Sequence, residues 1–163
     1  MANREHVRNR IYPLLRAEYD CAGRLNQLLD AETQALVARD VDAIERLIED
    51  KQNLLQEFET LEAQMQHLLR EAGFAGAERP DVEGCLNWCD DRGALMRGWR
   101  LVLDRIRHAQ QQNRINGATL ESARRHAQQA VALLRGQVPE VDVYNPAGAT
   151  AVNVAGSRTL AKA

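Results

Sequence analysis

Two cysteines are the residues in this sequence that come closest to forming a metal site. Cys85 and Cys89 are four positions apart, which would place both thiols on one face of a local helix. With a histidine they could bind Zn²⁺, but structural zinc sites use a second matching ligand pair, and the sequence has none. We therefore expect these thiols to be small buried hydrophobic groups, with no metal and no other cofactor.

Histidine chemistry has equally little support. The four histidines, His6, His67, His108 and His126, stand apart and form no His-Glu-x-x-His pattern. A phosphotransfer bundle would need one reactive histidine with lysine and glycine packed near it. His108 and His126 have arginine and alanine as their neighbours instead. Surface or boundary positions are therefore expected for these side chains.

Catalytic motifs are absent from the sequence. The two serines, Ser122 and Ser157, lie outside any Gly-x-Ser-x-Gly elbow, and no glycine-rich phosphate loop occurs. Acidic residues are plentiful, but their pattern offers no inward-facing Glu/His ligand pair. We expect no enzymatic activity.

Two asparagines and a tyrosine are candidates for binding rather than catalysis. Asn113 and Asn116 fall on the apolar seam of a long predicted helix, where asparagine usually forms a polar layer that fixes the register. The alternative is that they hydrogen-bond to the backbone of a bound protein. Tyr144 stands in a segment without helical period, and it is either inert or an aromatic anchor for a partner.

Long helices are the elements that must position these residues. Apolar residues recur at alternating intervals of three and four residues, which is the repeat of helices packed along a heptad seam. The repeat predicts helices over about residues 13–39, 41–71 and 91–135, with a short connector helix near 80–89. Pro13 suits a first helical turn, and a further short helical piece could precede it.

The fold class that follows from these elements is all-α. We predict an elongated antiparallel three-helix bundle or coiled coil over residues 1–136, because the link after the first helix is short. Residues 137–163 have no helical period, and we expect a flexible C-terminal tail there. The sequence has no run of about 18 apolar residues and no apolar signal core, which predicts a cytoplasmic protein without membrane insertion.

The charges favour packing between helices. Eight acids and two bases lie between Asp40 and Glu62, whereas nine bases and two acids lie between Arg92 and Arg135. An acidic helix beside a basic one is favourable at the edges of a seam. The net charge of −2 argues against nucleic-acid binding, which needs a concentrated basic surface.

The last predicted helix is longer than the hairpin by roughly a dozen residues. If it starts beside the end of the preceding helix, the apolar residues of its C-terminal part lack intramolecular cover. These are Leu120, Ala127, Val131 and Leu134. An uncovered stripe is a docking surface or a dimer seam. The alternative is that residues 72–91 shift the register and the whole helix is covered.

Three stretches of the sequence follow one another in a recognisable order. The first is the hairpin segment 28–62, which has Asp40 between its helices and Lys51 one turn after paired apolar residues. The second is Asn113-Arg114-Ile115-Asn116-Gly117, followed at the helix end by Ala132-Leu133-Leu134-Arg135-Gly136. The third is Tyr144 with Gly148. Over roughly residues 14–150, their order and spacing resemble the FlgN family.

This resemblance implies a bacterial cytoplasmic chaperone of flagellar type III export, with no catalysis and no cofactor. Such proteins hold hook-filament junction proteins, the hook-associated proteins FlgK and FlgL, before export. The client's disordered C-terminal segment folds as an amphipathic helix against the chaperone's last helix. The chaperone then docks on the cytoplasmic domain of the export gate component FlhA, where the family's tail tyrosine contributes. Tyr144 is the matching position.

The candidate client-binding residues lie on the last predicted helix: Asn113, Asn116, Leu120, Ala127, Val131 and Leu134. We expect a monomer or weak homodimer. One rival is a structural coiled coil that only self-associates, as a tight symmetric dimer through the uncovered stripe. A phosphotransfer or metal-binding bundle is the other.

Overall fold

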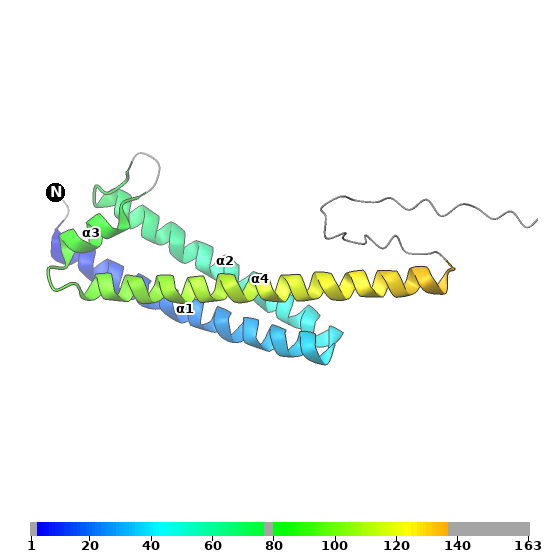
Figure 1. Ribbon diagram of the computed structural model, residues 1–163. Helices are drawn as coiled ribbons and strands as arrows, with labels where there is room; N and C mark the ends of the chain where they lie inside the picture. The colour runs from blue at the N-terminus through cyan, green and yellow to red at the C-terminus, as the bar shows by residue number, and fades with distance from the viewer. Residues whose placement is uncertain (1–2, 77–79, 137–163) are drawn as a thin grey trace, which may run out of the picture. The chain divides into compact units, whose positions relative to one another are not determined.

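The computed structural model describes residues 3–76 and 80–136 of the chain (Figure 1). Two compact units, residues 1–122 and 123–163, divide the chain, and each is described by itself. The described residues form four helices and no strand, which confirms the predicted all-α class. The helices are α1 (Arg4–Ala38), α2 (Val41–Glu71), α3 (Val82–Cys89) and α4 (Ala94–Leu134).

The first helix begins at Arg4 rather than near Pro13, which lies inside α1. Asn3 caps this earlier start, because its Oδ1 accepts a hydrogen bond of 3.0 Å from the Glu5 amide. Proline removes one backbone donor from the helix interior. The carbonyl that loses it belongs to Asn9, an exposed residue where water can replace the donor. Burial of apolar side chains before Pro13 therefore outweighs the local cost of the proline.

A tight turn joins α1 and α2 into an antiparallel hairpin. Arg39 adopts a left-handed conformation with φ of 56°, and its N–H reaches the carbonyls of Ala35 and Leu36. Asp40 caps α2, because its carboxylate accepts a 3.0 Å hydrogen bond from the Ala43 amide. Three ion pairs cross the hairpin: Arg10–Glu71, Arg24–Glu57 and Glu32–Lys51.

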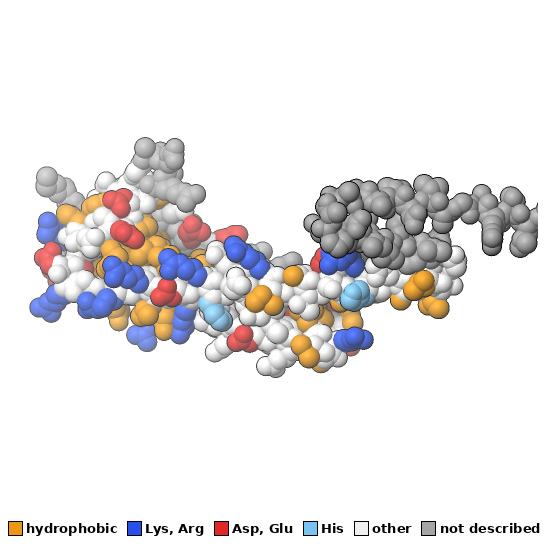
Figure 2. Space-filling view, viewed as in Figure 1, with side chains coloured by type: hydrophobic (Ala, Val, Ile, Leu, Met, Phe, Trp, Pro, Cys, Tyr) orange, Lys and Arg blue, Asp and Glu red, His pale blue; other side chains and the backbone are white. Residues whose placement is uncertain are grey.

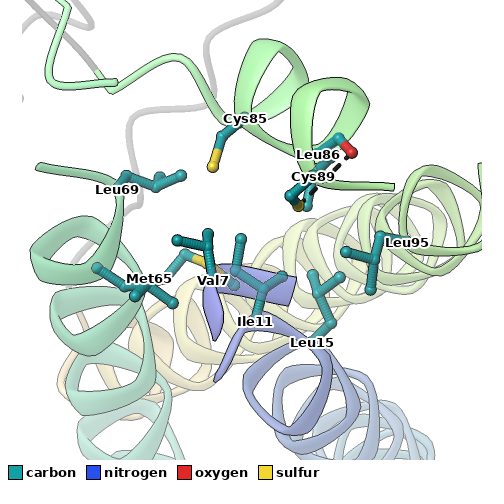
Figure 3. Packing of buried hydrophobic residues seen from close by; sticks show 10 residues of the cluster. Val7, Ile11, Leu15, Met65, Leu69, Cys85, Leu86, Cys89 and Leu95 are labelled. Carbon is teal, nitrogen blue, oxygen red and sulfur yellow. Dashed lines mark hydrogen bonds between the residues drawn. The ribbon is translucent and has the colours of Figure 1, made fainter. Parts of the chain in front are cut away.

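The main hydrophobic core of the first unit lies under α3 (Figure 3). It takes side chains from all four helices: Val7, Ile11, Leu15, Met65, Leu68, Leu69, Cys85, Leu86, Cys89 and Leu95. Asp90 then starts α4, accepting hydrogen bonds from the Leu95 amide at 2.8 Å and the Arg92 amide at 3.2 Å. These backbone bonds, the one from Leu95 above all, lower the pKa of Asp90. The short connector is therefore a structural part of the bundle.

Cys85 and Cys89 are buried in this core, and their thiols are free. Burial raises the pKa of Cys85 to about 12 and also raises that of Cys89. Both thiols are therefore neutral and act as small apolar groups. Among residues 3–76 and 80–136, no group of three His, Cys, Asp or Glu side chains is arranged to hold a metal ion. None of the helices found there is long and apolar enough to cross a membrane.

Several large hydrophobic side chains stay on the surface instead of joining the core (Figure 2). On α4 they are Leu101, Ile115, Leu120, Val131, Leu133 and Leu134, and on α1 they include Tyr12. Single exposed apolar residues need no explanation, but clusters mark contact surfaces. The exposed apolar side chains of α4 therefore make this helix the candidate for a binding surface.

Candidate binding surfaces on the last helix

The buried seam of α4 ends at Asn116. Four described residues of this helix are buried, at intervals of seven positions: Leu95, Val102, Ala109 and Asn116. This is the heptad spacing of a packed helix. From residue 117 to residue 136 no side chain is buried. The last buried residue of α4 is therefore a polar one.

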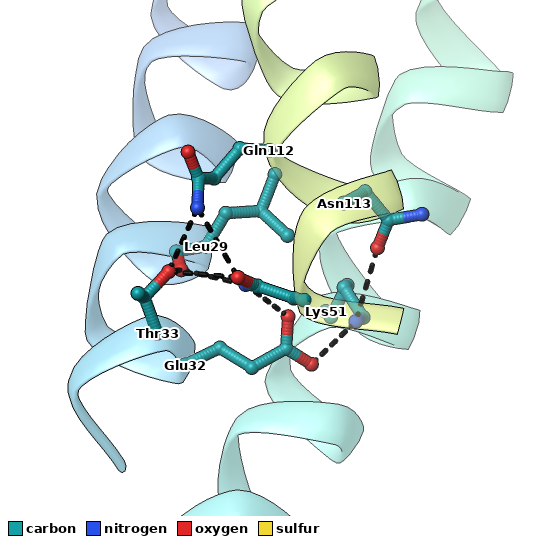
Figure 4. Close-up of polar contacts among 7 residues, drawn as sticks. Leu29, Glu32, Thr33, Lys51, Gln112 and Asn113 are labelled. Carbon is teal, nitrogen blue, oxygen red and sulfur yellow. Dashed lines mark hydrogen bonds and ion pairs between the residues drawn. The ribbon is translucent and has the colours of Figure 1, made fainter. Parts of the chain in front are cut away.

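Asn116 is buried, with 3% of its surface exposed, and its amide is saturated by hydrogen bonds (Figure 4). Its Nδ2 donates to the Leu29 carbonyl at 2.9 Å and to Glu32 Oε2 at 2.8 Å. Its Oδ1 accepts from Gln112 Nε2 at 3.2 Å and lies 2.8 Å from the Thr33 hydroxyl. All but Gln112 belong to α1, so this asparagine locks α4 against α1 at one register. No donor or acceptor of Asn116 is left for a bound client in this arrangement.

Asn113 sits beside this network at its α2 side. Lys51 Nζ forms an ion pair of 2.6 Å with Glu32 Oε1 and also donates to Asn113 Oδ1 at 3.3 Å. Glu32 is buried, whereas Asn113 is exposed. In Figure 4 the Nδ2 group of Asn113 points away from the network. The two asparagines thus have different positions: Asn116 is internal, and Asn113 presents an amide at the surface.

The seven residues in Figure 4 tie all three long helices together, and we call them the Asn116 layer. They are Leu29, Glu32, Thr33, Lys51, Gln112, Asn113 and Asn116. The asparagines and Lys51 stand out in the sequence, whereas Glu32, Thr33 and Gln112 were missed as members of this layer. One signal was available: Glu32 stands seven positions after Leu25, on the apolar stripe of the first helix. An acid on a seam indicates a buried carboxylate, although spacing does not say which residue pairs with it.

The remaining predicted client-binding residues are exposed. Leu120 and Val131 are each 45% exposed, and Leu134 is 89% exposed. Ala127 is exposed as well. Leu120 belongs to the first unit, and the other three belong to the second. The structure therefore places apolar side chains at the surface of α4 on both sides of the unit boundary.

Other predicted residues lie elsewhere. Tyr144 and the predicted tail, residues 137–163, fall outside the described ranges. His6, His67, His108 and His126 are all exposed. His108 Nδ1 lies 3.1 Å from Asn26 Oδ1. No arrangement of nucleophile, base and orienting group involves these histidines within the described part of the chain.

Comparison with known proteins adds one finding. A family model described as FlgN protein matches residues 1–151, which covers every described helix and the position of Tyr144. Neither the curated proteins nor the solved structures contain a match to the chain.

Proposed function

The chain belongs to the FlgN family of flagellar chaperones, and we propose from this premise that it is an export chaperone for hook-associated junction proteins of the FlgK and FlgL type. In this proposal it works in the cytoplasm, binds the C-terminal segments of its clients, and delivers them to the cytoplasmic domain of an export gate of the FlhA type. The protein acts by binding alone.

The exposed apolar side chains of α4 carry this proposal. Beyond Asn116, residues such as Leu120, Val131 and Leu134 stand at the surface of a helix that continues for several turns. An amphipathic client segment can lay its own apolar face along them, with anchors at i, i+3, i+4 and i+7. A segment that folds on binding loses part of its interaction energy to ordering, which suits a complex that must later be released.

The two asparagines have separate roles in the proposal. Asn116 fixes the register of α4 and so positions the client surface without touching the client. Asn113 is exposed, and its free Nδ2 group is placed to donate to a client carbonyl. Asn113, Leu120, Ala127, Val131 and Leu134 therefore make up the proposed contact set.

The test of the client surface is the double substitution Leu120→Asp with Val131→Asp. Charges on the proposed contact helix should abolish binding of a purified hook-associated protein, measured by calorimetry, while helicity by circular dichroism stays near that of the wild type. The matched control is Leu55→Asp, because Leu55 of α2 is 44% exposed, close to the 45% of Leu120, and lies on another helix. Unchanged client affinity in the double variant would refute this placement.

The proposed docking role of Tyr144 needs a separate test. Tyr144→Ala should weaken binding of the chaperone to the purified cytoplasmic domain of the gate component, while client affinity stays the same. Tyr144→Phe serves as the control, because it keeps the aromatic anchor. Equal loss of client and gate binding would contradict the division of roles.

A self-associating coiled coil is the second candidate function, because the same exposed leucines could form a dimer seam. It predicts a tight symmetric dimer that the Leu120→Asp and Val131→Asp pair dissociates. Sedimentation at micromolar concentration distinguishes the self-associating coiled coil from the export chaperone, since a chaperone of this kind should be a monomer or weak dimer. A tight dimer without client binding would favour the coiled coil.

A further inference from the structure

A glycine on the first turns of α4 has no explanation within the molecule. Gly98 is a helix-interior residue, and glycine there costs about 0.5–1 kcal/mol relative to alanine. A Cβ added at Gly98 would meet no other atom within 4 Å. At Gly23, by contrast, an added Cβ would meet the guanidinium of Arg105, so that side chain would have to shift. Internal packing therefore does not account for the glycine at position 98.

The open position lies in a groove between α1 and α4. We call it the α1–α4 groove; it encloses about 170 Å³ and lies wholly within the first unit. Its lining residues are Tyr12, Leu15, Arg16, Tyr19, Ala94, Leu95, Gly98 and Leu101. Tyr12 and Leu101 are each more than half exposed. Any larger side chain at position 98 would take up space in this groove.

Spacing within the lining fits a helical guest. The α1 residues recur as Tyr12, Leu15, Arg16 and Tyr19, which is one face of that helix over two turns. Hydrogen bonds join Tyr19 to Arg105 and Thr33 to Gln112, so α1 and α4 run in the same direction along this side. Two nearly parallel helices with an apolar groove between them can pack against a further helix, as in a four-helix bundle.

The rim of the groove is basic. Arg16 lines it, and Arg105 lies over the ring of Tyr19, another lining residue, at 3.5 Å. The first turn of α4 has no acidic residue. No ion pair with an acid is found for Arg16 or Arg105 within residues 3–76 and 80–136. Figure 2 shows hydrophobic side chains together with Lys, Arg, Asp and Glu over this end of the first unit.

We propose that the α1–α4 groove is a second docking site, which takes an acidic amphipathic helix of another protein. Apolar side chains of the guest fill the space over Gly98 and contact Tyr12 and Leu101, while its flanking carboxylates face Arg16 and Arg105. A second copy of this chain is disfavoured as the guest, because a symmetric contact would bring these arginines against their own copies. The groove shares no residue with the proposed client surface.

The test uses the full chain and a labelled synthetic peptide. The peptide is a helix of about 18 residues with leucine at i, i+3, i+4 and i+7 and glutamate at the flanking positions. Its counterpart has lysine in place of every glutamate. We expect fluorescence anisotropy to show binding of the acidic peptide at least about tenfold tighter than that of the lysine peptide, with weaker binding at high salt.

Filling the groove without changing any charge separates a docking site from general attraction to a basic surface. Gly98→Leu should weaken binding of the acidic peptide by about tenfold and leave the thermal midpoint equal or higher, because its side chain enters open space. Gly98→Ala should give a smaller loss in the same direction. Gly117→Leu is the matched control, since Gly117 is also a glycine of α4 with no atom within 4 Å of an added Cβ.

Three outcomes would overturn the proposal. The first is equal affinity for the acidic and lysine peptides. The second is wild-type affinity of the acidic peptide for the Gly98→Leu chain. The third is self-association of the wild type that Gly98→Leu abolishes, which would make a second copy the occupant. The Leu120→Asp and Val131→Asp double variant should lose client binding but keep the wild-type affinity for the acidic peptide. A failure of the docking-site proposal can therefore be told apart from a failure of the proposed chaperone function.

Discussion

Two glutamates of α1 are almost equally buried, but one carboxylate has partners and the other has an oxygen without one. Glu18 is 4% exposed and Glu32 is 5% exposed. Both carboxylate oxygens of Glu32 are used, one by Lys51 and the other by Asn116. The Oε2 atom of Glu18 is buried without a hydrogen-bond partner in the described structure. Burial together with the neighbouring Glu62 raises the pKa of Glu18 to about 7.

The difference shows that partners, rather than depth, decide what a buried carboxylate does. The α2 residue that faces Glu32 is a lysine, whereas the charged residue of α2 near Glu18 is another acid. Glu32 therefore anchors three helices at the Asn116 layer. Glu18 opposes folding whenever it is ionised, because an unpaired charge is costly in a site with little water. Substitutions at each glutamate and at its charged neighbour test this difference.

The largest effect is expected from Lys51→Met. It removes the cation from a buried carboxylate that cannot move to water, so we expect the free energy of unfolding to fall by about 3 kcal/mol at pH 7. Urea unfolding followed by circular dichroism measures this loss. Arg24→Met is the control, because the Arg24–Glu57 pair is exposed and should contribute less than about 1 kcal/mol.

Adding Glu32→Gln to Lys51→Met distinguishes the effect of the unpaired charge on Glu32 from the effect of losing the lysine side chain. The neutral amide needs no cation, and its oxygen can still accept from Asn116 Nδ2. We expect the double variant to recover at least about half of the lost stability. A double variant as unstable as Lys51→Met alone would show that the lysine stem, rather than the charge on Glu32, supplies the stability.

Glu18→Gln should have the opposite sign. At pH 8 it removes an unpaired buried charge, and we expect the free energy of unfolding to rise by about 2 kcal/mol. Chemical unfolding of the variant and wild type at pH 8 gives the difference. A loss of stability instead would mean that a bound water or cation satisfies the carboxylate.

The pH dependence tests the same group more directly. Since the pKa of Glu18 is raised from 4.5 to about 7, the folded chain holds a proton that the unfolded chain releases over this window. Glu18 therefore contributes stability below about pH 4.5 that is lost as the pH rises through about 7. The wild type minus Glu18→Gln difference in unfolding free energy should fall across that range, and a flat difference would contradict the raised pKa.

The smallest effect is expected from Glu62→Gln. Glu62 is exposed, so solvent screens its repulsion of Glu18, and burial remains the main cause of the raised pKa. The titration midpoint of the Glu18 carboxyl, followed by carbon-13 NMR, should move slightly toward lower pH. A midpoint that drops to the ordinary value for glutamate would make Glu62, and not burial, the dominant cause.

The sequence by itself determined the all-α class, the heptad seams and the family resemblance. Intervals of three and four residues encode helices and their buried faces locally, so the buried residues of α4 could be read at seven-residue spacing. The start of α1 was misjudged, because the cost of Pro13 is local while the core that outweighs it is built from distant helices.

Only the tertiary structure decided which polar residues are paired. Glu18 and Glu32 occupy similar seam positions, and nothing in their neighbouring residues tells them apart. The register of the hairpin sets Lys51 against one and an acid near the other, and the register of α4 turns Asn116 inward. Hydrogen bonds between helices depend on distances of a few tenths of an ångström, which spacing along a chain does not specify. The sequence pattern therefore determined the helices, whereas tertiary packing determined whether each buried polar group has a hydrogen-bond or ion-pair partner.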